Sequence, residues 1–298
     1  MLILWLRPMA VQKSPTYNFT VIIDITRSMN ATDYPADTQA ISRLEHVKNT
    51  LRQLIAQLPC ESKIGLGLFT ERRSTLLFEP LEVCHSFAEI DAAISHIDWR
   101  MAWAADSNIA KGLLSTLDML QNSDSQIIFI TDGQEAPPVN PNYRADFSTL
   151  KNKAKGLILG AGGLAAVPIP KFDEQGKANG FYTVDDVPHR SSFGQSNLDP
   201  SQIEGYNARN APFGSAAVKG TEHLTALHED YLKQLATESG LAYARLTDLA
   251  ALQETLQTGS LAIEKPVATD VRWQPALLAL AMLALIYWPR FFNLRRRS

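Results

Sequence analysis

The chain has 298 residues, of which 45% are hydrophobic and 20% are charged, and its formal net charge is −3. This balance excludes a disordered chain, and the excess of basic residues typical of a nucleic-acid-binding protein is missing. Two cysteines are too few for a disulfide scaffold or a four-cysteine zinc site. The length suffices for one large domain or two small ones with a hydrophobic core.

From residue 19 to about residue 258, after a short N-terminal segment at 1–18, apolar strands alternate with amphipathic helices. This alternation predicts an α/β domain with a doubly wound, mostly parallel sheet. The first strand, Phe19–Ile23, is continuously apolar and β-branched, as is typical of a central buried strand. In the following helix, Thr38–Leu58, apolar residues recur every three or four positions, and Asp37 or Thr38 can cap it.

Two further strands, Lys63–Phe69 and Ser74–Phe78, are joined by a polar turn and predict one antiparallel hairpin at the edge of the sheet. The remaining elements are expected in this order: helices at Ser86–Ile97 and Asn108–Gln121, strands at Gln126–Ile130 and Gly156–Gly160, a helix at Tyr231–Ser239, a strand at Ala242–Arg245 and a helix at Thr247–Gln257. Residues 168–220 are rich in Gly, Pro, Asn and Ser and lack periodicity, which indicates an irregular insertion.

After a linker at 259–271, the uncharged run Trp273–Pro289 predicts a transmembrane helix at 272–289. A buried helix of a soluble core is the alternative, but the run is apolar all round and aromatic at both ends. The basic tail at 290–298 places the C-terminus in the cytoplasm and the domain in the periplasm, held by a single pass of the inner membrane. The apolar stretch Met1–Leu6 is too short for a span or a signal sequence, so either the chain begins upstream or export takes another route.

Acidic and hydroxyl side chains follow two of the predicted strands. Asp24, Thr26 and Ser28 come directly after the first strand, and Asp132 follows the strand Gln126–Ile130. The carboxyl ends of parallel strands meet at one edge of the sheet, where ligands bind in such folds. An all-oxygen cluster there favours a hard divalent cation, Mg²⁺ or Ca²⁺. Taken singly, each aspartate could equally be an ordinary strand-end residue.

The patterns Asp24-x-Thr26-x-Ser28 and Thr131-Asp132-Gly133 together resemble the von Willebrand factor A (VWA) family and its metal-ion-dependent adhesion site. The resemblance implies that Asp24, Thr26 and Ser28 bind one divalent cation and that Asp132 reaches it through water. It also places Ser107, in the segment Ala105–Ile109, at the position of the family's threonine ligand. Two family residues are replaced with their hydroxyls kept, by Thr26 and Ser107, and Asp106 stands where a glycine is usual.

Further motifs resemble the membrane-anchored VWA proteins of the Bat aerotolerance type and, more closely, the methanol-oxidation accessory (MxaL-like) class. These motifs include Arg43-Leu44-Glu45, Leu58-Pro59-Cys60 and the run Thr131–Pro138. The resemblance implies a non-enzymatic module that binds a protein partner presenting an acidic residue. Implied partners are periplasmic quinoprotein methanol dehydrogenase or its assembly factors, other VWA proteins and a MoxR-type AAA+ ATPase. The implied role is maturation through calcium insertion; a general envelope assembly or stress factor of the Bat type is the alternative.

Two enzymatic functions are alternatives to a binding module. A metal-dependent hydrolase would need a general base, and Asp106 is the sole candidate. The run Gly160–Ala165 fits a dinucleotide-binding loop, but Pro168 and Pro170 follow too soon for a helix. We therefore expect no catalytic residues and no organic cofactor.

The two cysteines flank the predicted hairpin: Cys60 precedes its first strand and Cys84 follows its second. In an antiparallel pair these positions lie side by side, so the two sulfurs can meet in a disulfide. Two buried, reduced thiols are the alternative. We favour the disulfide because the predicted compartment is oxidising.

Overall fold

The computed structural model describes residues 9–35, 40–102, 106–136, 144–173, 175–183, 186, 222–258 and 261–294. The chain divides into two compact units, which are described one at a time: residues 17–262, and a second unit made of residues 1–16 and 263–298.

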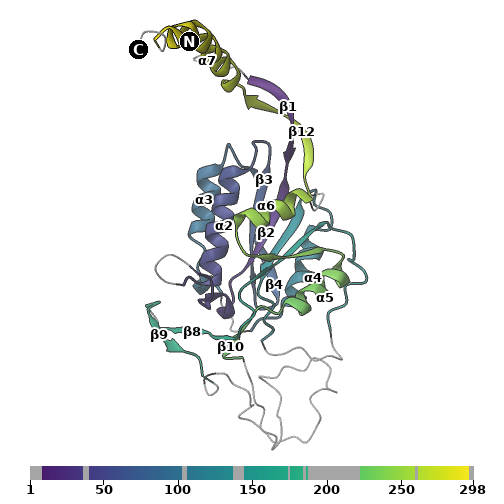
Figure 1. Cartoon of the computed structure of the whole chain (residues 1–298). Coiled ribbons are helices and arrows are strands. Elements are labelled where there is room, and N and C mark those ends of the chain that lie inside the picture. The colour runs from purple at the N-terminus through teal and green to yellow at the C-terminus, as the bar shows by residue number, and fades with distance from the viewer. Residues whose placement is uncertain are drawn as a thin grey trace, which may run out of the picture. The chain divides into compact units, whose positions relative to one another are not determined.

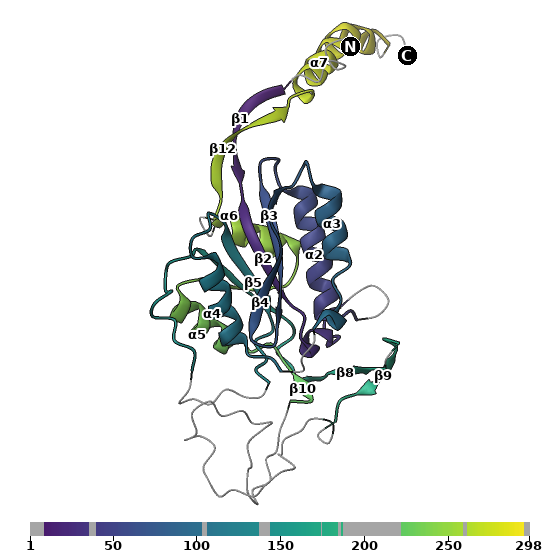
Figure 2. The same cartoon turned by 180° about the vertical axis from the view of Figure 1, so that it is seen from behind.

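The first unit is built on a six-stranded sheet with the order β11-β6-β5-β2-β3-β4 (Figures 1 and 2). Every neighbouring pair is parallel except β3 and β4, which form the expected antiparallel hairpin at one edge. The sheet strands are β2 (Asn18–Asp24), β3 (Lys63–Thr70), β4 (Arg73–Glu82), β5 (Gln126–Thr131), β6 (Gly156–Ala161) and β11 (Ala242–Leu246). The predicted mixed α/β fold with a mostly parallel sheet is confirmed.

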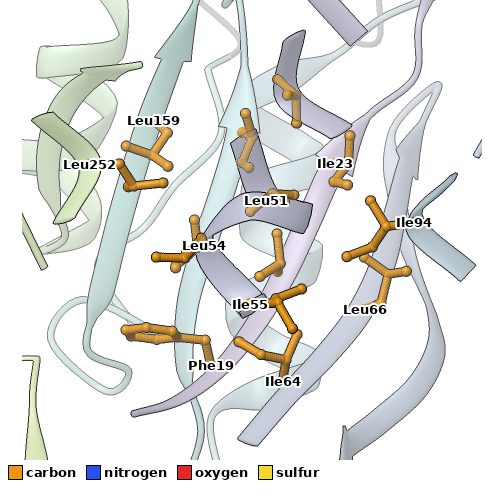
Figure 3. Packing of buried hydrophobic residues seen from close by; sticks show 14 of the residues in the cluster. Phe19, Ile23, Leu51, Leu54, Ile55, Ile64, Leu66, Ile94, Leu159 and Leu252 are labelled. Carbon is orange, nitrogen blue, oxygen red and sulfur yellow. The ribbon is translucent and has the colours of Figure 1, made fainter. Parts of the chain in front are cut away.

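Helices cover both faces of this sheet, and each layer has its own hydrophobic core. One core, shown in Figure 3, joins the sheet to α2 (Arg43–Gln57), α3 (Phe87–Ser95) and α6 (Leu249–Thr258). The other joins it to α4 (Ile109–Leu120) and α5 (Glu229–Ser239). Because both faces are covered, β5 and β6 are buried along their whole length, which explains their unbroken apolar sequences.

Helix α2 begins at Arg43, five residues later than the sequence pattern indicated. Its cap is Ser42, whose hydroxyl accepts a hydrogen bond from the backbone N–H of Glu45 at 3.1 Å. The caps expected from the sequence, Asp37 and Thr38, lie outside the described residues.

The segment expected to be irregular contains short strands. β7 (Val167–Pro168) pairs with β10 (Leu224–Thr225), and β8 (Pro170–Phe172) pairs with β9 (Ala178–Phe181), both antiparallel. Residues 187–221, which hold most of the predicted insertion, lie outside the described part of the chain. Two short 3₁₀ helices, η1 (Arg27–Asn30) and η2 (Trp99–Met101), complete this unit.

The predicted disulfide is present: Cys60 and Cys84 are bonded, with their Cα atoms 5.3 Å apart. Cys60 lies just before β3 and Cys84 just after β4. Because the two strands are antiparallel, with Lys63 opposite Glu82, their outer ends lie side by side. The hairpin topology therefore brings the two sulfurs together.

The second unit consists of a β-ribbon followed by a helix. β1 (Met9–Thr16) pairs antiparallel with β12 (Ile263–Asp270) over their whole length, so the residues expected to be a linker instead form a strand. The helix α7 (Trp273–Leu294) includes the run expected to span a membrane. Within the described residues, however, no helix is both long and apolar enough for a membrane crossing. The expected transmembrane helix at 272–289 is therefore not found.

Candidate metal centre

The residues expected to bind a cation lie at the point where the strand order reverses. β3 lies on one side of β2 and β5 on the other, so β2 and β5 flank a topological switch point, where ligands bind in open α/β sheets. Asp24 is the last residue of β2, and Asp132 follows β5 directly. Both side chains are fully buried, which places two carboxylates at one edge of the sheet.

Asp24 is held by two neutral donors. Its Oδ1 accepts a hydrogen bond from the backbone N–H of Thr26 at 2.8 Å, and its Oδ2 accepts one from Thr131 Oγ1 at 2.6 Å. Burial, and next the charge of Asp132, raise the pKa of Asp24 to about 7 despite these bonds. The raised pKa shows that the charge of Asp132 disfavours ionisation of Asp24. A cation bound between the two carboxylates would remove this repulsion.

Thr26 and Ser28 lie at the start of η1, immediately after Asp24. The turn that begins at Asp24 brings their hydroxyls together, with Thr26 Oγ1 and Ser28 Oγ 3.4 Å apart. Both side chains are buried. The motif thus presents one carboxylate and two hydroxyls from a single short segment.

Ser107 reaches the same edge from the loop before α4. Its backbone N–H and C=O both bond to Ala136, four residues after Asp132, at 2.7 and 2.8 Å. On its other side the loop bridges to Glu71, which follows the end of β3. The Ser107 hydroxyl is buried, 2% exposed, and has no hydrogen-bond partner in the described structure. A buried hydroxyl without a partner is costly, so this oxygen is suited to a ligand.

These donors fit a hard divalent cation. The set contains carboxylate and hydroxyl oxygens and no sulfur or imidazole, as Mg²⁺ and Ca²⁺ prefer. Among the described residues, the other group with the spacing of a metal site is Cys60, Glu82 and Cys84. There the two sulfurs are bonded to each other and offer no thiolate.

Asp132 is held differently, by a buried guanidinium that the motif analysis gave no role. Its Oδ1 accepts a hydrogen bond from the backbone N–H of Gln134 at 2.9 Å, whereas its Oδ2 accepts one from Arg43 Nη1 at 2.6 Å. Arg43 lies one helical turn before Val47, on the apolar stripe of α2. A charged residue on a buried face was the sequence signal that could have identified it.

A third carboxylate, the half-buried Glu135, fixes the start of α4 beside Ser107. Glu135 accepts hydrogen bonds from the backbone N–H groups of Ile109 and Ala110 and from Tyr231 Oη. Burial raises the pKa of Glu135. Glu135 thereby links the segment after Asp132 to α4, the helix that follows Ser107. The same side chain thus fixes the positions of the Asp132 segment and the Ser107 segment relative to each other.

The β8–β9 hairpin borders the site next to η1. The Arg27 guanidinium lies 5.2 Å from the centre of the Tyr182 ring, and Trp99 stacks on Phe172 at 5.2 Å. A cavity of about 450 Å³ lies beside the hairpin, and Asn30 of η1 is part of its lining. The segment η1, which contains Ser28, is therefore adjacent to a cavity whose lining includes the aromatic residues Trp99 and Phe172.

Comparisons with known proteins give a family match over part of the chain. Residues 19–134 match the family model described as the von Willebrand factor type A domain. No curated protein matches the chain in sequence.

Several solved structures are similar over most of the chain. An aerotolerance-related membrane protein from Bacteroides fragilis is 16% identical with a TM-score of 0.49, covering 80% of this chain and 96% of that one. BatB from Bacteroides thetaiotaomicron has the same identity, score and coverage of this chain, and 95% of its own chain is covered. A membrane-spanning protein from Vibrio fischeri is 20% identical with a TM-score of 0.29, covering 81% and 96%.

The matched region holds all five expected ligands: Asp24, Thr26, Ser28, Ser107 and Asp132. Neither the family model nor these structures identify the methanol-oxidation class. Residues 19–134 are therefore similar in sequence to the von Willebrand factor type A domain, and this is the region that contains the candidate site.

Proposed function

We propose that this domain binds one divalent cation, Mg²⁺ or Ca²⁺, and through it a protein partner. Asp24, Thr26, Ser28 and Ser107 would hold the cation directly, and Asp132 through water. The observation that carries this proposal is the Ser107 hydroxyl, which is buried and has no hydrogen-bond partner in the described structure, in a loop that bridges the residue after β3 and the segment after Asp132.

The bound cation would supply a positive charge at the edge of the sheet that attracts a carboxylate of the partner. The chain's own residues set the geometry of this contact. Thr131 orients Asp24, and Glu135 fixes the start of the helix after Ser107. Because these supports are hydrogen-bonded, the ligands need little rearrangement to bind, which favours affinity.

The domain acts by binding rather than by catalysis in this proposal. VWA domains generally serve as adhesion or interaction modules, and Asp24 and Asp132 are both committed to hydrogen bonds that orient them. The Cys60–Cys84 disulfide supports a location in an oxidising compartment such as the periplasm.

For the biological role, the motif resemblances support two settings. In one, the partner is a quinoprotein methanol dehydrogenase or one of its assembly factors, and the role is calcium insertion. In the other, the domain is a general envelope assembly factor of the Bat type. Identifying the captured partner by mass spectrometry separates them, because only the first setting yields a dehydrogenase.

The test is affinity capture with the purified full chain from a lysate of its own cells, in Mg²⁺, in Ca²⁺ and in chelator. We expect capture in at least one cation and none in chelator. Asp24→Ala should abolish capture, whereas Asp118→Ala, which removes an exposed carboxylate of α4, should not. Circular dichroism checks that both variants fold. Equal capture in chelator and by the folded Asp24→Ala variant would disprove the proposal.

A further inference from the structure

Arg43 is a fully buried cationic side chain beside the candidate metal site. Its side chain is 0% exposed, and its guanidinium lies between two carboxylates. Nη1 donates to Asp132 Oδ2 at 2.6 Å, and Nη2 donates to Asp33 Oδ2 at 2.7 Å. Nη1 also donates to Thr225 Oγ1 at 2.9 Å. One positive charge is thus shared between Asp132 and Asp33.

The surrounding chain is shaped to hold this guanidinium. Gly162 has a φ of +133°, and a Cβ at this position would lie 2.7 Å from Arg43 Nε. The next residue, Gly163, donates its backbone N–H to Asp33 Oδ2 at 2.8 Å. A side chain at position 162 would displace the guanidinium, so the Gly162–Gly163 segment provides the space that the ion pairs need.

The two aspartates of the metal site therefore differ in charge balance. Asp132 Oδ2 accepts from Arg43 and from Thr225 Oγ1, the latter at 3.2 Å, so its negative charge is offset. The hydrogen bonds to Asp24 come from the neutral groups of Thr26 and Thr131, so no cationic side chain offsets its charge in the way that Arg43 offsets that of Asp132. A cation at this edge meets one uncompensated carboxylate instead of two.

We infer that Arg43 lowers the affinity of this domain for its cation by neutralising Asp132. The inference rests on the proposed function and deepens it. Affinity for hard cations follows the number of charged ligands, so a site with one uncompensated carboxylate holds its cation weakly. A partner that supplies a second carboxylate strengthens cation binding, and by linkage the cation strengthens partner binding equally. Arg43 thus makes cation and partner bind together.

The experiment is calorimetric titration of the full chain with Mg²⁺ and with Ca²⁺. The double variant Arg43→Met/Asp33→Asn removes one positive and one negative charge, so the net charge of the protein is unchanged. We expect this variant to bind the cation at least tenfold more tightly than the parent. The control is Arg52→Met/Asp91→Asn, which removes a surface ion pair between Arg52 of the same helix, α2, and Asp91 of α3, with N–O distances of 2.6 and 2.9 Å. The control should leave the cation affinity unchanged.

The single variant Asp33→Asn should change the cation affinity in the opposite direction. This second test remains valid even if the double variant does not fold. Without Asp33, the whole guanidinium charge faces Asp132, so cation affinity should fall severalfold. Asp91→Asn on the surface pair should leave it unchanged. If the parent binds a cation and Asp33→Asn binds it equally or more tightly, the inference is wrong while the proposed function stands. If neither the parent nor any variant binds a cation, the proposed function itself fails.

Discussion

Replacing Asp24 by asparagine should stabilise the metal-free protein at alkaline pH, although it removes a buried, hydrogen-bonded group. The folded protein raises the Asp24 pKa from 3.8 to about 7 through burial and the charge of Asp132. At about 1.4 kcal/mol per pH unit, holding this carboxylate ionised costs the folded state on the order of 4 kcal/mol above pH 7. Asparagine carries no charge and avoids this cost.

The substitution also loses part of a hydrogen bond, which sets the net effect. Asparagine can still accept from the Thr26 N–H, but its amide group would meet the Thr131 hydroxyl that now donates to Asp24. That mismatch costs about 1–2 kcal/mol. We therefore expect Asp24→Asn to be about 2–3 kcal/mol more stable than the parent near pH 8.5 in chelator.

The sign of the effect depends on pH. The folded state holds the Asp24 proton more tightly than the unfolded state, so protonation of Asp24 stabilises the parent. This contribution to the free energy of unfolding is fully present below about pH 4 and is lost as the pH rises through 7. The advantage of Asp24→Asn should vanish near pH 5, where the cost of ionising Asp24 equals the cost of the mismatch, and the parent should be the more stable protein at about pH 4 and below. Urea denaturation in chelator at several pH values measures this, and a difference that does not change with pH would refute the reasoning. With Mg²⁺ at about 100 times its dissociation constant, the parent alone should gain about 2.7 kcal/mol.

Three further substitutions test other parts of the structure. Ser107→Ala should weaken cation binding severalfold in calorimetry while leaving the metal-free stability within about 1 kcal/mol, because the lost hydroxyl has no partner; an unchanged affinity would remove Ser107 from the site. Cys60→Ala/Cys84→Ala should lower the free energy of unfolding by about 3 kcal/mol, as expected for a bridge with a sequence separation of 24. Two free thiols in the native protein, found by mass spectrometry of non-reduced peptides, would contradict the bridge. Gly112→Ala should destabilise the protein by about 1–2 kcal/mol in thermal unfolding despite a better helix propensity, because the new Cβ would lie 2.1 Å from Phe69 Cε2. A stabilised variant would show that the ring can move aside.

The local pattern of apolar and polar residues was sufficient to predict most strands of the sheet and most of its helices. Strand β2 follows from the apolar run after residue 18, and α4 from its apolar spacing and its capping residue Asn108, whose side chain accepts from the Lys111 N–H. The Cys60–Cys84 bridge followed from the predicted hairpin. In each case the residues that determine the element are close in sequence, so the spacing of apolar residues and the turn residues suffice to predict it.

The metal-site residues were identified from motif resemblance, and their role as ligands stays a prediction. The structure adds that Asp24 and Asp132 lie at neighbouring strand ends and that Ser107 is tied to Ala136. It also assigns a role to Glu135, which the run Thr131–Pro138 contains without indicating one, because that role depends on the folded position of α4.

The sequence by itself determined the alternation of strands and helices, because burial on one or both faces imposes a repeat that can be read within a few residues. Only the tertiary structure decided which residues meet across long separations. The β1–β12 ribbon joins the two ends of the described chain, and Arg43 bonds to Asp132, 89 positions away. An arginine at the start of an amphipathic helix is ordinarily read as solvent-exposed. Its burial became favourable only when the fold brought two carboxylates and a glycine segment around it, since a buried charge persists where it is paired.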